Sequence, residues 1–136
     1  MRLWFARILI GVVIAWNLQA ALAFFLSPGT FATGFELSGI PGLAAVRGIA
    51  VLFVMWNVPY VMAAWQPQRH SLSLLEALVM QFIGVSGETV ILLTLPPGHA
   101  VLQGSIQRFL TFDACGLAVL ALAMWLARKQ NQDVSQ

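Results

Sequence analysis

Four long stretches of hydrophobic residues follow one another along this chain, and breaks of proline, glycine or charge separate them. The stretches cover approximately residues 3–26, 42–65, 74–95 and 103–127. A hydrocarbon core about 30 Å thick requires roughly 20 apolar residues of α-helix, so each stretch can cross it. Breaks such as Ser27-Pro28-Gly29 are typical of helix ends at an interface. The pattern predicts an all-α fold, a bundle of four transmembrane helices forming one domain over residues 1–129.

A weak internal repeat refines this picture. Residues 48–52 (GIAVL) resemble residues 116–120 (GLAVL), and the break at 26–29 (LSPG) resembles the break at 95–98 (LPPG). A duplication would arrange the bundle as two parallel helical hairpins. The connection over residues 30–40 is longer than a hairpin requires and contains two phenylalanines, so we expect it to lie in the membrane interface.

The composition excludes a water-soluble domain. Hydrophobic residues make up 60% of the 136 residues and charged residues only 9%, whereas soluble domains carry about 25% charged residues. The seven basic residues are dispersed rather than gathered in a run, so no nucleic-acid partner is expected. The partner that the composition predicts is the lipid bilayer.

Five basic residues near the predicted helix ends indicate the orientation of the chain in the membrane. They all fall on one side of the predicted topology: Arg2, Arg7, Arg69, Arg128 and Lys129. The first and third loops contain no lysine or arginine. Because cytoplasmic loops are enriched in these residues, we expect both termini in the cytoplasm, with 130–136 as a short cytoplasmic tail. The predicted location is the cell's inner membrane.

Polar residues inside the predicted spans form two layers at similar depths. The layer nearer the non-cytoplasmic side contains Gln19, Arg47, Glu88 and Arg108. The deeper, secondary layer contains Asn17, Asn57, Gln81 and Asp113. A charge at the centre of a membrane helix costs about 2.5–3.5 kcal/mol, so these groups should face one another inside the bundle.

The four charged members of the two layers balance, two against two. We expect Arg47, Glu88, Arg108 and Asp113 to form a network with Gln19, for which the sequence leaves two interpretations open. The network is either a structural set of ion pairs that fixes helix register, or a site for a polar ligand or proton. Two arginines beside one glutamate would also leave hydrogen-bond donors for a small anion.

Other chemistry finds little support in the sequence. Cys115 is the only cysteine, and His70 and His99 lie in loops on opposite sides of the predicted membrane. No metal site, bound haem or catalytic motif is therefore predicted, and no cofactor follows from the residues themselves. An intramembrane enzyme using Glu88 or Asp113 as an acid–base group remains a third, less favoured hypothesis.

The chain resembles the DoxX-like group of small four-helix bacterial membrane proteins. The resemblance rests on an arginine in the first helix, a Pro-Gly break followed by phenylalanines, and an Arg-Gly pair in the second helix: Arg7, Pro28, Gly29, Phe31, Phe35, Arg47 and Gly48. It implies accessory roles in membrane complexes and a link to quinone-dependent redox chemistry. Quinone as a cofactor, and a larger membrane complex or homo-oligomer as partner, are implied by this resemblance.

Two functional hypotheses follow. The first is an accessory or assembly subunit of a membrane complex, in which the polar layers are structural. The alternative is a binding protein or carrier for a small anionic or lipophilic solute, which would use the buried Arg/Glu layer. The second hypothesis predicts a cavity at the level of Arg47, Glu88 and Arg108.

Overall fold

The computed structural model describes the backbone of residues 1–134 and the side chains of residues 1–129. The chain forms five α-helices: α1 (Arg2–Leu26), α2 (Pro28–Gly34), α3 (Gly39–Trp65), α4 (Ser71–Thr94) and α5 (Ala100–Val134). The backbone so described contains no strand. Each of the four long helices is long and apolar enough to cross a membrane. The all-α four-helix bundle is therefore confirmed, and it fits a small multi-pass membrane protein.

Turn residues mark the helix boundaries. Pro28 is the first residue of α2, a position where a proline loses only an N–H group that the helix leaves unpaired anyway. Gly39, the first residue of α3, and Gly98, before α5, have positive φ angles of 65° and 103°, which glycine adopts without steric cost. Helix α5 extends to Val134, so the predicted tail, 130–136, begins as a continuation of the last helix.

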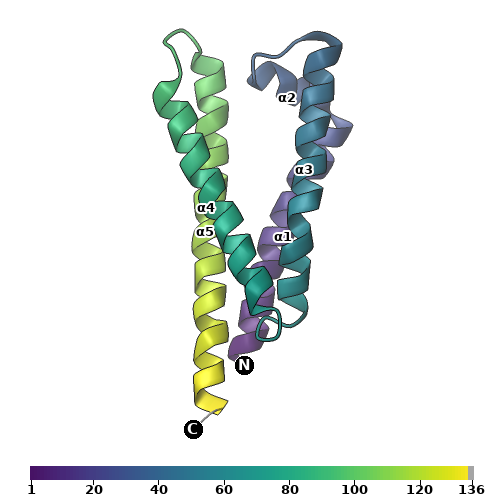
Figure 1. Ribbon diagram of the computed structural model, residues 1–136. Helices are drawn as coiled ribbons and strands as arrows, with labels where there is room; N and C mark the ends of the chain where they lie inside the picture. Colours follow the sequence, from purple (N-terminus) through teal and green to yellow (C-terminus); the bar gives the residue numbers. More distant parts are fainter. Residues whose placement is uncertain (135–136) are drawn as a thin grey trace.

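The four long helices form two hairpins that meet at one end and diverge at the other (Figure 1). Helices α1 and α3 form the first hairpin, with α2 between them in the chain, and α4 and α5 form the second. Both termini lie where the hairpins meet, which we call the terminus end; the opposite end is the α2 end. Since α1 and α4 both leave the terminus end, the hairpins are parallel, as the internal repeat predicts.

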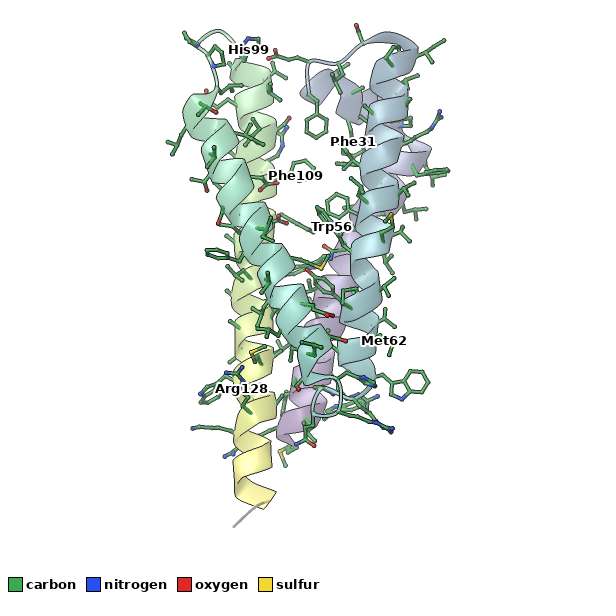
Figure 2. The ribbon with its side chains drawn as sticks, in the orientation of Figure 1. Phe31, Trp56, Met62, His99, Phe109 and Arg128 are labelled. Carbon is green, nitrogen blue, oxygen red and sulfur yellow. The ribbon has the colours of Figure 1, made fainter. Side chains whose placement is uncertain are left out.

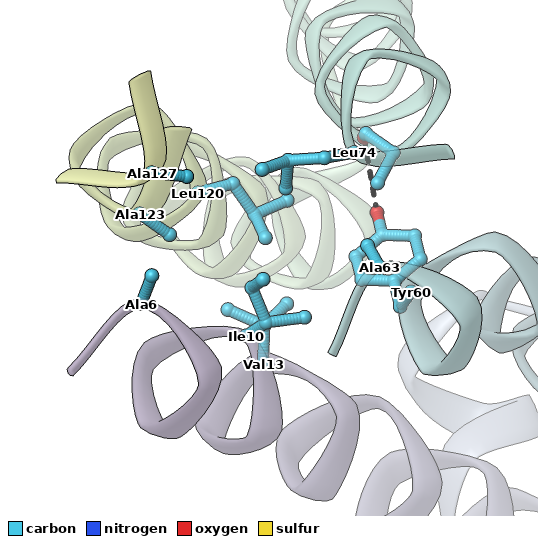
Figure 3. Packing of buried hydrophobic residues seen from close by; sticks show 10 residues of the cluster. Ala6, Ile10, Val13, Tyr60, Ala63, Leu74, Leu120, Ala123 and Ala127 are labelled. Atoms are coloured by element: carbon cyan, nitrogen blue, oxygen red, sulfur yellow. Dashed lines mark hydrogen bonds between the residues drawn. The ribbon is translucent and has the colours of Figure 1, made fainter. Parts of the chain in front are cut away.

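A core built by all four long helices closes the bundle at the terminus end (Figure 3). It includes Ile10, Leu74 and Leu120, each at most 1% exposed. Five of its ten buried residues are alanines, which allow the helix backbones to approach closely. Nearby, Arg7 Nε donates a hydrogen bond of 3.0 Å to the carbonyl oxygen of Ala64, in the last turn of α3, where carbonyl groups lack helical partners.

A second core lies at the α2 end, but its buried residues come from α1, α2 and α3 alone. They are Ala21, Phe24, Ala32, Val46, Ala50 and Phe53. Helix α4 contributes buried residues only in its first half, and Gln81 is the last of them. Its second half therefore diverges from the first hairpin, which leaves a space between the hairpins at the α2 end.

Candidate ligand-binding cavity

A cavity of about 470 Å³ lies between α3, α4 and α5 toward the α2 end. We call it the carboxylate cavity, because Glu88 and Asp113 line it. The rest of its wall is apolar: Phe35, Ile49, Leu52, Phe53, Trp56, Ile83, Gly84, Gly87, Ile91, Leu102, Ile106 and Phe109. Its volume and its apolar wall with a few polar groups are typical of small-molecule sites.

A cluster of phenylalanine rings separates this cavity from a second one of about 370 Å³. Phe24 lies at its centre, with ring centroids 4.3 Å from Phe31, 6.2 Å from Phe35 and 5.7 Å from Phe109. Figure 2 shows Phe31 and Phe109 extending into the space between the hairpins. The second cavity, lined by Arg108, is called the arginine cavity.

Asp113 is held by a chain of hydrogen bonds that crosses three helices. The Tyr60 hydroxyl on α3 donates to Oε1 of Gln81 on α4, at 2.7 Å. Nε2 of Gln81 then donates to Oδ1 of Asp113 on α5, at 3.0 Å, and to the Asp113 carbonyl oxygen, at 3.1 Å. All three side chains are buried. These hydrogen bonds fix the position of the Asp113 carboxyl group at the wall of the cavity.

Two glycines make room for this hydrogen-bond chain. A Cβ atom at Gly84 on α4 would collide with Oδ2 of Asp113. A Cβ atom at Gly116 on α5 would lie 2.7 Å from Nε2 of Gln81. Contacts this short do not occur between such atoms, so each helix offers a bare backbone position to the polar side chain of the other. This explains two glycines in the middle of membrane helices, where they otherwise weaken the helix.

Glu88 lies one turn beyond Gly84 on α4 and has a less satisfied environment. Its Oε2 atom is buried and has no hydrogen-bond partner. Within the described residues, no arginine, lysine or histidine forms an ion pair with Glu88 or Asp113. A buried polar atom without a partner costs about 1–3 kcal/mol, and more when the group is charged. The lining of the cavity therefore includes one acceptor atom, Glu88 Oε2, that no part of the described chain satisfies.

Arg108 faces away from these carboxylates. Its guanidinium donates a 2.9 Å hydrogen bond to Oγ of Ser105, and this hydroxyl donates a 2.6 Å hydrogen bond to the Gly34 carbonyl oxygen at the end of α2. Arg108 and Gln19 also line a groove between α1 and α5, on the side away from Glu88. The pair that the sequence predicts between Arg108 and Glu88 is therefore not formed.

Arg47 differs most from its predicted position. It is exposed on the outward face of α3, while the preceding residue, Val46, is completely buried. One residue corresponds to about 100° of rotation around a helix, which turns the arginine away from the bundle. The predicted network of Gln19, Arg47, Glu88, Arg108 and Asp113 is thus corrected: Glu88 and Asp113 share one cavity, and the other three residues lie elsewhere.

The secondary polar layer is buried as a whole, since Asn17, Asn57, Gln81 and Asp113 all lie inside the bundle. The hydrogen bond that joins two of its members is the one from Gln81 to Asp113. Asn57 instead donates to the Phe53 carbonyl oxygen of its own helix, at 2.7 Å, and its Oδ1 atom is buried without a partner. All four members therefore lie away from lipid, and the hydrogen bond between Gln81 and Asp113 brings two of them together.

A polar contact joins the two hairpins at the α2 end. Nδ1 of His99, before α5, lies 2.5 Å from Oε2 of Glu36, between α2 and α3. Oε1 of Glu36 accepts a 3.3 Å hydrogen bond from the Leu102 backbone N–H, in the first turn of α5. The hydrogen bond with His99 holds the pKa of Glu36 below its ordinary value. Together with the bond from Ser105 to Gly34, this contact fastens the α2 segment to α5.

Tyr60, Glu36 and His99 were not predicted as site residues, although the sequence contained signals for each. Tyr60 is the chain's only tyrosine and lies three residues after Asn57, on the same helical face. Glu36 and His99 occur in the two loops that the charge pattern places on one side of the membrane. The phenylalanine cluster left no comparable signal, because a phenylalanine in a membrane helix faces lipid as readily as it faces a neighbouring helix.

The described residues include no group of three or more histidine, cysteine or acidic side chains that could hold a metal ion. The arrangement can instead accept hydrogen bonds, or oppose a positive charge, at one end of an apolar cavity. Comparisons with protein-family models, with curated proteins and with solved structures find no match to this chain.

Proposed function

We propose that this protein binds a lipophilic small molecule in the carboxylate cavity. The observation that carries the proposal is an aromatic and aliphatic cavity of about 470 Å³ that contains a buried carboxylate oxygen, Glu88 Oε2, without a partner. Apolar walls with a few fixed polar groups are the usual construction of a ligand site. Asp113 is positioned in advance by Gln81, which lowers the cost of ordering the site when a ligand binds.

The side of the cavity between α3 and α4 offers a route from the bilayer. Ile83 and Ile91 line the cavity, yet 62% and 53% of their surfaces are exposed. In a membrane these exposed surfaces face lipid chains, so a lipophilic ligand reaches the cavity without passing through water. The opposite side is closed where Ser105 and Glu36 bind α2 and α5 together.

We further propose that the terminus end faces the cytoplasm of a bacterial cell and that the membrane is the inner membrane. The basic residues of the loops and chain ends, Arg2, Arg7, Arg69, Arg128 and Lys129, support this orientation. The cavity then lies in the non-cytoplasmic half of the bilayer, and the contact between Glu36 and His99 lies at its non-cytoplasmic surface.

A role as an accessory subunit of a larger membrane complex is the second candidate. The observation that favours it is Arg47, whose charged side chain projects from the outer face of a membrane helix. Such a group requires a polar environment, which a carboxylate of a neighbouring subunit would supply. This role does not account for the carboxylate cavity, so we place it second.

A quinone, which the resemblance to DoxX-like proteins implies, matches the apolar wall of the cavity but not its polar end. Quinone carbonyl oxygens accept hydrogen bonds, which the Glu88 and Asp113 carboxyl groups can donate only when they are protonated. We therefore propose a ligand that itself donates hydrogen bonds or carries a positive charge, and a quinone remains what the resemblance implies.

Filling the cavity with a new side chain tests the proposed function. A Cβ atom at Gly87 would meet no atom within 4 Å, and Gly87 lines the cavity, so Gly87→Leu adds bulk there without a clash at its Cβ. Gly48→Leu is the matched control, because Gly48 has equally open surroundings and is exposed on α3.

The wild type and both variants are purified in mild detergent, and their organic extracts are compared by mass spectrometry. We expect a lipophilic compound that accompanies the wild type and Gly48→Leu and is depleted from Gly87→Leu. Equal contents in all three proteins would contradict binding in this cavity.

A further inference from the structure

We infer that the ligand of the carboxylate cavity is a lipophilic cation, whose positive centre lies beside Glu88 and Asp113 while its apolar part contacts the aromatic wall. This inference rests on the proposed function and specifies the chemistry of the ligand. It follows from the charges that line the cavity, the free acceptor atom and the aromatic rings around them.

The charges lining the cavity are of one sign. Two carboxylates line it and no basic side chain does, since Arg108 belongs to the neighbouring arginine cavity and Arg47 points outward. Ionised groups at membrane depth are normally paired with an opposite charge. A positively charged ligand supplies the pairing that the two arginines of the spans do not.

One carboxylate oxygen at the cavity has no partner in the described protein. Oδ1 of Asp113 is engaged by Gln81, whereas Glu88 Oε2 is buried and has no partner. Gly87, next to Glu88 on the cavity wall, carries no side chain, and no atom lies within 4 Å of the position that its Cβ would take. The wall beside Glu88 therefore has room at Gly87 for a bulky group such as a substituted ammonium.

The aromatic wall suits the same class of ligand. Phe35, Phe53, Trp56 and Phe109 line the cavity. The faces of aromatic rings attract cations, and aromatic enclosures are the common recognition element for substituted ammonium groups. An anion meets two acidic side chains and no basic one here. The structure therefore favours a cation over the anion that the predicted arginine layer suggested.

Three probes of nearly equal shape and different charge test the inference. Benzyltrimethylammonium is the cation, neopentylbenzene is its uncharged carbon analogue, and phenylmethanesulfonate is the anion. Binding is measured by equilibrium dialysis against the full-length protein in phosphatidylglycerol nanodiscs, with empty nanodiscs subtracted. This lipid has no cationic headgroup that could occupy the site.

We expect saturable binding of benzyltrimethylammonium and no saturable binding of phenylmethanesulfonate. Glu88→Gln should weaken the binding of the cation by about tenfold or more, since it removes a partly desolvated opposite charge. The same variant should leave the binding of neopentylbenzene unchanged. Glu76→Gln is the matched control on the same helix, because Glu76 is exposed and lies outside the cavity. Asp113→Asn provides a second neutral variant that keeps an oxygen to accept the hydrogen bond from Gln81.

The outcomes separate the two levels of the proposal. Equal binding of the cation and neopentylbenzene, unaffected by Glu88→Gln but abolished by Gly87→Leu, would overturn the cationic ligand and leave the cavity as a lipophilic site. Binding of all probes that survives Gly87→Leu would overturn the proposed function itself.

A cationic ligand could be a free amine or the headgroup of an aminolipid. Repeating the dialysis in phosphatidylcholine nanodiscs distinguishes these sources. Weaker probe binding there identifies the lipid headgroup as a competitor, and unchanged binding identifies a free cation. Either result requires that the cation bind in phosphatidylglycerol first, and its failure to bind there contradicts the inference.

Discussion

Nε2 of Gln81 on α4 donates hydrogen bonds to both Oδ1 and the carbonyl oxygen of Asp113 on α5, at 3.0 and 3.1 Å. This double contact joins the two helices of the second hairpin at the point where the bundle opens. Tyr60 extends it to α3 and so to the first hairpin. The three side chains therefore contribute both to the cohesion of the hairpins and to the position of the Asp113 carboxylate.

Removing the Tyr60 hydroxyl tests this coupling. We expect Tyr60→Phe to lower the free energy of unfolding by about 1 kcal/mol, the typical value of one buried hydrogen bond. In a double-mutant cycle with Gln81→Leu, the two losses should be less than additive, because both variants break the same bond. Reversible unfolding in mixed micelles provides the measurement. Strict additivity would show that Tyr60 and Gln81 act separately.

The two glycines that make room for the hydrogen bonds of Gln81 and Asp113 give a second prediction. Gly84→Ala and Gly116→Ala place a methyl group against Asp113 and Gln81, respectively, so each should lower the free energy of unfolding by about 1–3 kcal/mol. Gly48→Ala meets no atom and should be neutral or stabilise the helix by up to about 1 kcal/mol. The same unfolding assay compares the three. Equal effects at all three positions would mean that helix propensity alone is responsible.

The contact between Glu36 and His99 gives a pH dependence. Because its folded pKa is held below the ordinary 4.5, Glu36 contributes stability that is fully present above this pH and is lost as the pH falls through the lowered value. The difference in melting temperature between wild type and Glu36→Gln should therefore shrink as the pH falls below about 4.5.

Thermal unfolding at a series of pH values between 7 and 3 measures this difference. His99→Gln serves as the companion variant, since it removes the imidazole that lies 2.5 Å from Glu36. We expect His99→Gln to lose most of the pH-dependent stability that the contact with Glu36 gives the wild type. A wild-type advantage that grows as the pH falls from 4.5 to 3 has the wrong sign for this contact and would exclude it.

The core at the terminus end should hold the hairpins together. Leu120 is completely buried in it, whereas 79% of the surface of Leu93, near the end of α4, is exposed. Leu120→Ala should lower the free energy of unfolding by about 1–3 kcal/mol through lost packing, because lipid removes much of the solvent-transfer part of the usual cost. Leu93→Ala should have little effect. Similar losses at both positions would argue against a closed core at this end.

The sequence by itself determined the number of spans, their approximate ends and the all-helical class. These depend on quantities that are linear along the chain, namely the length of apolar runs and the positions of breaks such as Pro28 and Gly98. The depth of the secondary layer stays a prediction, while its members Asn17, Asn57 and Gln81 are all buried within the bundle. Depth needs only the helical rise per residue.

Only the tertiary structure decided which polar groups meet. Arg47 lies at the predicted depth but on the outer face, and Arg108 bonds to Ser105 instead of Glu88. Which side chains face one another depends on the rotation of each helix about its axis and on the divergence of the hairpins. Both are set by packing. The alanine-rich core draws four helices together at one end, whereas the buried residues of the second core come from only three helices, α1, α2 and α3, at the other. The cavity beside Glu88 and Asp113 results from that difference in packing, which no single span contains.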